Sequence, residues 1–72
     1  GQKVQNIRQA FLHLGPTAEF SLVAQIPPRQ VATVLEHPWN GIRQKESYWW
    51  LCKFGGVEGW CPEEFLRLES SP

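Results

Sequence analysis

The segment YWWLCKFGGVEGWCPEEFL, residues 48–66, constrains the fold of this chain more than any other stretch. It places the Gly55-Gly56 pair between two runs rich in aromatic and apolar residues. Two glycines in that position predict a two-residue β-hairpin, because a type I′ turn needs positive φ at both central residues. The segment also holds three of the four tryptophans and both cysteines, so the two faces of this hairpin determine much of the core.

A reversal at the glycine pair fixes which side chains lie opposite one another. Lys53 then faces Glu58, and this cross-strand charge match supports the register. The other expected pairs are Phe54 with Val57, Cys52 with Gly59, Leu51 with Trp60 and Trp50 with Cys61. Because side chains alternate along a strand, one face carries a largely apolar set. That predicted core face comprises Trp50, Cys52, Phe54, Val57, Gly59 and Cys61.

The opposite, wetter face brings Trp49, Leu51 and Trp60 together beside the Lys53–Glu58 pair. Two interpretations of it stay open. The three side chains form an exposed patch, which on a small monomer usually marks an interaction site. Alternatively, a terminal segment or the loop around Trp39 covers them. We expect Trp39 itself to fold back onto the body, since an isolated loop tryptophan would leave a large apolar area in water.

The two cysteines favour neither a disulfide nor catalysis. In the expected register Cys52 and Cys61 are diagonal neighbours, about 7 Å apart, whereas a disulfide needs a Cβ separation of about 3.8 Å. We predict two buried free thiols without a cationic neighbour, and therefore no enzyme activity. The C-x8-C spacing, with His13 and His37 far away in sequence, shows no metal-ligand pattern, so no metal or cofactor is expected.

Outside the hairpin the sequence predicts mainly short extended segments. Residues 1–6 are polar and predict a flexible tail. Residues 7–14 favour a short strand over a turn of helix. Residues 21–26 alternate in part, with Leu22, Ala24 and Ile26 on one face, and residues 30–36 predict a strand rich in β-branched residues. Residues 37–47 predict a long exposed loop. Pro62 begins a single helical turn, in which Glu63 and Glu64 are favourable N-terminal charges. Residues 66–68 are expected to form the last strand of the sheet, and residues 69–72 a tail.

Such a pattern predicts an all-β, partly open small barrel in one domain of 72 residues. Seven basic and seven acidic residues cancel. A neutral surface gives no reason to expect nucleic acid or an anionic membrane as a partner, and no apolar run is long enough for membrane insertion. The abrupt start suggests an excised fragment of a larger protein, so the lack of a signal sequence is uninformative.

The string WWLCKFGGVEGWCPEEFLRL resembles the C-terminal half of a Src-homology-3 (SH3) domain. The matching features are Trp49-Trp50, Gly55-Gly56, Gly59, Trp60-Cys61, Pro62 and Phe65. The stretch LHLGPTAEFSLVAQIPPRQVATVLE is more similar to the bacterial form of the family, SH3b. This resemblance spans residues 11–68 and implies an SH3-like, partly open, five-stranded β-barrel with a single-turn helix before the last strand, over residues 7–68.

The resemblance also implies where a ligand would bind. The family's peptide-contact positions map onto Trp49, Pro62 and Phe65, with Trp60 and Leu51 on the same face, and its acidic loop is reduced to Glu19. Two departures matter. The family's tyrosine positions read Leu12 and Leu14, which removes hydroxyl donors for ligand carbonyls, and the reduced acidic loop removes the attraction for a basic ligand residue. A groove of flat aromatic and proline walls holds an extended peptide at low entropic cost.

These observations predict a non-catalytic binding or docking module, a monomer when isolated, within a larger and bacterial protein. Its expected partner is a peptide, a cell-wall glycopeptide or an adjacent domain of the same protein. The alternatives are an SH3 domain of eukaryotic type that binds proline-rich peptides, and a structural domain packed permanently against its parent chain. The sequence leaves both the cytoplasm and the cell envelope open as the compartment.

Overall fold

A computed structural model describes residues 2–68, which form a small all-β domain. Its strands are β1 (Lys3–Asn6), β2 (Ala10–His13), β3 (Leu22–Ile26), β4 (Val31–Val34), β5 (Ile42–Gln44), β6 (Ser47–Phe54), β7 (Val57–Pro62) and β8 (Leu66–Leu68). The one helical element of the described residues is the single 3₁₀ turn η1 (Glu63–Phe65). None of these residues forms a helix long and apolar enough to cross a membrane.

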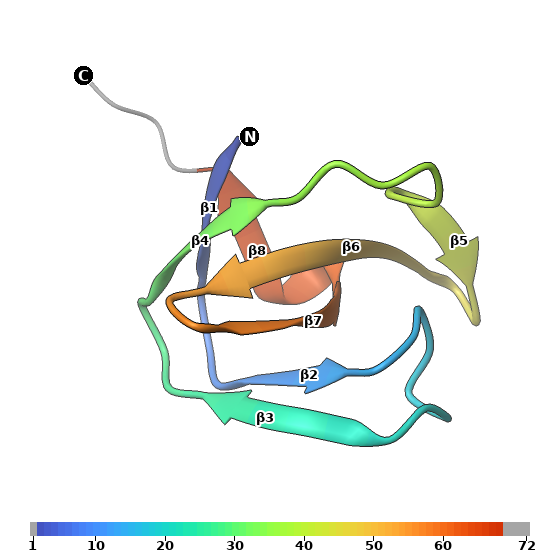
Figure 1. Cartoon of the computed structure of the whole chain (residues 1–72), viewed down its shortest axis with the longest axis horizontal. Coiled ribbons are helices and arrows are strands. Elements are labelled where there is room, and N and C mark those ends of the chain that lie inside the picture. Colours follow the sequence, from blue (N-terminus) through green and yellow to red (C-terminus); the bar gives the residue numbers. More distant parts are fainter. Residues whose placement is uncertain (1, 69–72) are drawn as a thin grey trace.

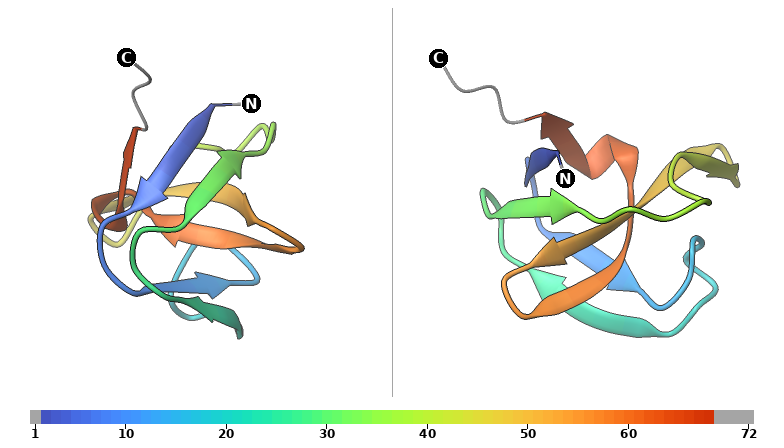
Figure 2. Two further views of the ribbon diagram at one scale, coloured as in Figure 1. Left: turned by 90° about the vertical axis from the view of Figure 1, so that its left-hand side faces the viewer. Right: turned by 45° about the horizontal axis from the view of Figure 1, so that its top comes forward.

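All eight strands of the described part belong to one antiparallel sheet, where five had been predicted. Their order is β3-β2-β7-β6-β4-β1-β8, and β5 pairs with β6 beside this path. In Figure 1 the β2–β3 hairpin lies below β6 and β7, while β1, β4 and β8 lie on their other side. No pairing among residues 2–68 joins β3 to β8, so the sheet curls without closing (Figure 2).

The β6–β7 hairpin has the predicted register. Lys53 pairs with Glu58, and the series continues to Trp50 opposite Cys61 and Trp49 opposite Pro62. The turn type differs from the prediction, because only Gly55 has positive φ, at 61°. A positive φ at the first central residue alone is the pattern of a type II′ turn.

The core lies on the predicted face of this hairpin. Cys52 and Cys61 are fully buried and unbonded, as predicted, and Phe54 is 6% exposed. The side chains packed against them come from the first half of the chain and are Val4, Ala10, Leu12, Ile26 and Ala32. Core residues from β1 to β4 thus meet the hairpin that the sequence identified.

The prediction of a flexible tail at residues 1–6 is wrong. Residues 3–6 form β1, which pairs with both β4 and β8, and Val4 is buried. Asn6 is completely buried and donates from Nδ2 to the Pro27 carbonyl at 2.7 Å, while its Oδ1 accepts from the Gln30 amide at 2.7 Å. The polar sequence hid this strand, because the Asn6 side chain is buried with backbone partners while the Lys3 and Gln5 side chains bond to other side chains at the surface. The predicted tail at 69–72 lies outside the described residues.

The prediction of a long exposed loop over residues 37–47 also needs correction, because part of it forms a strand. β5 lies within it and forms a second hairpin with β6, in which Gln44 pairs with Ser47. Its two turn residues, Lys45 and Glu46, both have positive φ, at 51° and 71°. Neither residue type is common in that conformation, so the sequence carried no hairpin signal here.

Candidate functional site

Three of the predicted contact residues line one groove. Trp49 and Pro62 are directly paired across β6 and β7, and Phe65 follows them on η1. Together with side chains from the β2–β3 hairpin they enclose a volume of about 490 Å³. The lining residues are Phe11, His13, Ala18, Leu22, Lys45, Ser47, Trp49, Pro62, Glu64 and Phe65.

The walls of the groove come from opposite ends of the sequence. Phe11 and His13 alternate with the buried Leu12 along β2, so they point away from the core and into the groove. Leu22 reaches the same side because a register irregularity between Leu12 and His13 places it opposite His13. The predicted alignment of Leu22 on one face with Ala24 and Ile26 is therefore wrong, and Leu22 is 49% exposed.

The indole of Trp49 forms the floor of the groove and is itself only 5% exposed. Its Nε1–H donates to the Gln44 carbonyl at 3.2 Å, and the His13 ring meets it edge-on with centroids 6.0 Å apart. The floor therefore offers an apolar ring surface, while its one polar hydrogen is already bonded within the chain.

Polar groups stand at the rim. Lys45 and Glu19 form an ion pair that joins the 14–21 loop to the β5–β6 turn. Ser47 Oγ donates to Glu64 Oε2 at 2.9 Å, which leaves the other carboxylate oxygen of this groove-lining residue as an acceptor. His13 Nδ1 donates to the Phe20 carbonyl at 3.0 Å, so Nε2 of the neutral ring is also an acceptor.

The predicted exposed patch of Trp49, Leu51 and Trp60 is not formed, because Trp60 is only 6% exposed and Trp49 is buried as well. The alternative interpretation applies to Trp60, against which the loop around Trp39 packs. Its residue His37 packs edge-on against Trp60, with ring centroids 5.0 Å apart. Leu51 is partly buried, and neither it nor Trp60 lines the groove.

Trp39, in contrast, was predicted to be covered and is exposed. It was expected to fold back onto the body, but 58% of its surface is exposed. The side chain that covers Trp60 is instead that of His37, from the same loop as Trp39. Among the Trp, Tyr and Phe side chains of residues 2–68, Trp39 therefore has the greatest exposed fraction.

The two thiols lie on the core side of the sheet, away from this groove. Burial raises the pKa of both Cys52 and Cys61 to about 12, and at Cys61 the charges of Cys52 and Glu64 add to this effect. A thiol with such a pKa is protonated at neutral pH and is a poor nucleophile. No cluster of three or more His, Cys, Asp or Glu side chains with metal-binding geometry occurs within residues 2–68.

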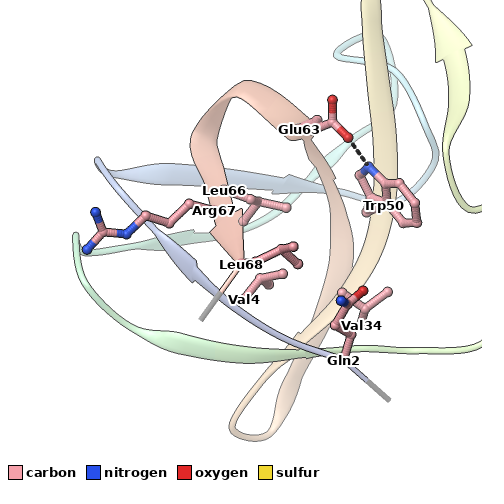
Figure 3. Close-up of a pocket in the computed structure, with 8 residues that line it drawn as sticks. All are labelled: Gln2, Val4, Val34, Trp50, Glu63, Leu66, Arg67 and Leu68. Carbon is pink, nitrogen blue, oxygen red and sulfur yellow. Dashed lines mark hydrogen bonds between the residues drawn. The ribbon is translucent and has the colours of Figure 1, made fainter. Parts of the chain in front are cut away.

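A second, smaller cavity of about 370 Å³ lies at the β1–β8 side of the sheet (Figure 3). Its walls are mainly apolar, from Val4, Val34, Trp50, Leu66 and Leu68. The Trp50 indole N–H donates across its edge to Glu63 Oε1 at 3.2 Å. None of the predicted contact residues lines this cavity.

Comparisons with protein-family models, with curated protein sequences and with solved structures find no match to this chain.

Proposed function

We propose that this chain is a non-catalytic, SH3-like binding module that holds an extended peptide segment in the groove between the β2–β3 hairpin and η1. The observation that carries the proposal is the convergence of Trp49, Pro62 and Phe65 on one mainly apolar groove. Flat aromatic and proline surfaces suit an extended backbone, whose stiffness limits the entropy lost on binding. The order of elements, with a tight hairpin, a single 3₁₀ turn and a last short strand, supports the SH3-like assignment.

The polar rim argues against an ordinary proline-rich ligand. Such a ligand presents backbone carbonyls and needs hydrogen-bond donors, but the Trp49 indole N–H is already donated to Gln44. Leu12, at one of the family's tyrosine positions, is completely buried, and Leu14, at the other, does not line the groove. Glu64 and His13 provide acceptors instead. We therefore favour a segment that brings donors of its own.

The surroundings of the candidate nucleophiles support a binding role over a catalytic one. Both thiols are completely buried, with pKa values raised by that burial to about 12. In the groove, the Lys45 ammonium is paired with Glu19 and is exposed to solvent. An exposed, ion-paired lysine lacks the desolvation that activates catalytic lysines.

The test uses the indole N–H signals of the ¹⁵N-labelled chain during titration with short peptides and a soluble peptidoglycan fragment. The peptides include a proline-rich sequence and a sequence with aromatic and basic side chains. Binding in the groove should move the Trp49 signal and the His13 ring signals, while Trp50, which faces the other cavity, serves as an internal reference. If no probe moves Trp49 while the chain stays folded, the proposal fails.

A further inference from the structure

Trp39 lies at the tip of a turn that the rest of the chain holds in place. Its backbone amide donates to His37 Nδ1 at 3.1 Å, and its carbonyl accepts from the Ile42 amide at 3.0 Å. The Asn40 amide donates to the His37 carbonyl at 3.1 Å, which closes the turn. The exposure of this large ring is therefore not a consequence of a loose loop.

The Asn40 side chain fixes the turn to the neighbouring strands. Its Nδ2 donates to the Leu35 carbonyl, and its Oδ1 accepts from the Leu51 amide at 2.8 Å. Gly41 continues the turn with φ of +79°, and a Cβ there would lie 3.3 Å from the Trp50 ring. A rigidly mounted tryptophan is a favourable binding anchor, because little conformational freedom is lost when it is buried.

The anchor and the groove have complementary hydrogen-bonding groups. The indole N–H groups of Trp49 and Trp50 both donate within the chain. No acceptor for the indole N–H of Trp39 is found within residues 2–68. The groove has acceptors to offer, because Glu64 and His13 both line it and retain one carboxylate oxygen and Nε2, respectively, for a ligand.

We infer that Trp39 of one copy of this chain inserts into the groove of a second copy, so that the groove recognises a protruding indole. The inference rests on the proposal that the groove is a binding site, and it names a tryptophan side chain on a turn, instead of an extended segment, as the group bound there. Trp39 does not line the groove of its own chain, so the contact is made between molecules. Equal numbers of acidic and basic residues give no net charge that would keep copies apart.

Such a contact is heterologous, because anchor and groove are different surfaces of the same molecule. It builds head-to-tail chains of copies and leaves a free anchor at one end and a free groove at the other. One tryptophan and its rim make a small interface, so association is weak and depends strongly on concentration.

The test uses two variants that each remove one half of the contact. Trp39→Ala lacks the anchor, and Leu22→Lys places a charge in the groove at a half-exposed position where the fold tolerates it. The mass of the wild-type chain should rise in sedimentation experiments from about 10 µM to about 1 mM, the range of weak interfaces. Each variant alone should stay monomeric, and their equimolar mixture should form a dimer and nothing larger.

Two controls make the result specific. Val31→Lys introduces the same charge at another half-exposed apolar side chain, on the interior strand β4, and should associate like the wild type. Trp39→Phe keeps an aromatic ring without its N–H and should associate several-fold more weakly than the wild type. The dispersion of amide NMR signals shows whether each variant is folded.

A wild-type chain that remains monomeric over this range would overturn the inference. So would a mixture of Trp39→Ala and Leu22→Lys that remains monomeric while the wild type associates, since another surface would then be responsible. Titration of the Trp39→Ala variant with ligand probes tests the proposed function of the groove separately. If peptide or glycan probes still move the Trp49 signal there, the groove binds ligands even though a second copy is not among them.

Discussion

Asn6 shows how much of this fold depends on a single polar side chain. It is completely buried, and its Nδ2 is within hydrogen-bonding distance of the carbonyls of Arg8, Ile26 and Pro27. Its Oδ1 accepts from the Gln30 amide, so one side chain links β1 to the turn between β3 and β4. Buried polar groups left without partners cost about 1–3 kcal/mol each.

We therefore expect Asn6→Asp to lower the free energy of unfolding by more than about 3 kcal/mol. The substitution replaces the donor Nδ2 by an oxygen that faces carbonyl oxygens, and it buries a charge. Urea denaturation followed by tryptophan fluorescence measures the change. Gln5→Ala is the control, because Gln5 is bonded only at the surface, to Arg67, and should change stability by less than about 0.5 kcal/mol. Equal effects of the two substitutions would contradict this account of Asn6.

The buried thiols make stability depend on pH in the alkaline range. Burial raises the pKa of Cys52 and Cys61 from 9.0 to about 12, so in the folded chain both thiols keep their protons well above pH 9. In the unfolded chain they ionise near their ordinary pKa, and the unfolded state then binds fewer protons than the folded state. Stability should fall as pH rises from about 9 toward 12, by at most about 1.4 kcal/mol per pH unit for each thiol.

Urea unfolding at about pH 8 and about pH 10 measures this slope. A variant with alanine at both cysteine positions is less stable at every pH, but the part of the slope that comes from the thiols should disappear. If wild type and double variant lose stability equally between the two pH values, the thiols are not the cause.

At the scale of elements, the hairpins show which part of the fold could be predicted. The β6–β7 hairpin was predicted with its register, because Gly55-Gly56 and the Lys53–Glu58 pair are local signals. The β5–β6 hairpin was missed, because its turn is made by Lys45 and Glu46 in a conformation that favours glycine and asparagine. The turn is held by contacts with residues distant in sequence, such as the ion pair of Lys45 with Glu19, and the local sequence does not reveal such contacts.

The residues of the candidate site were likewise predicted only in part. Trp49, Pro62 and Phe65 were identified from a motif, and they lie together. Phe11 and Leu22 were missed, because their place in the groove depends on how β2 pairs with β3 and on the irregularity beside His13. A pattern of alternating residues cannot reveal an irregularity that reverses the alternation.

The close contact between β2 and β7 leads to a testable prediction about stability. Gly59 on β7 lies so close to β2 that a Cβ there would be 2.6 Å from the Leu12 Cβ and 3.3 Å from the His13 carbonyl oxygen. We expect Gly59→Ala to destabilise the domain by about 1–3 kcal/mol, because β2 and β7 must move apart. Thermal or urea unfolding measures the loss.

Gly56→Ala is the matched control, because a Cβ at residue 56 meets nothing within 4 Å and its φ is not in the left-handed region. It should change stability by less than about 0.5 kcal/mol. Gly55→Ala is expected between the two, since φ of +61° strains any residue with a Cβ. If Gly59→Ala were as harmless as Gly56→Ala, the close approach of β2 and β7 would be wrong.

For the molecule as a whole, the open sheet makes the first strand indispensable. β1 is the only partner of β8 within residues 2–68, and it also pairs with β4. Val4 and Asn6 from this strand are buried, so its loss would expose the core and leave the carbonyls around Asn6 without their donor. Because a chain of this size buries a small core, such a loss is a large part of its stability.

We therefore predict that a chain beginning at residue 7 does not fold cooperatively, although its sequence retains every residue of the groove. Its amide NMR spectrum should lose dispersion, and its urea unfolding curve should lack the sigmoidal shape that is expected for the chain of residues 1–72. Replacing residues 1 and 2 by alanine is the control, since both precede β1 and should leave the curve unchanged within about 0.5 kcal/mol. A truncated chain that unfolds cooperatively with the wild-type midpoint would mean that β1 is dispensable. The sequence-based interpretation of residues 1–6 as a tail would then describe its energetics better than the pairing with β4 and β8 does.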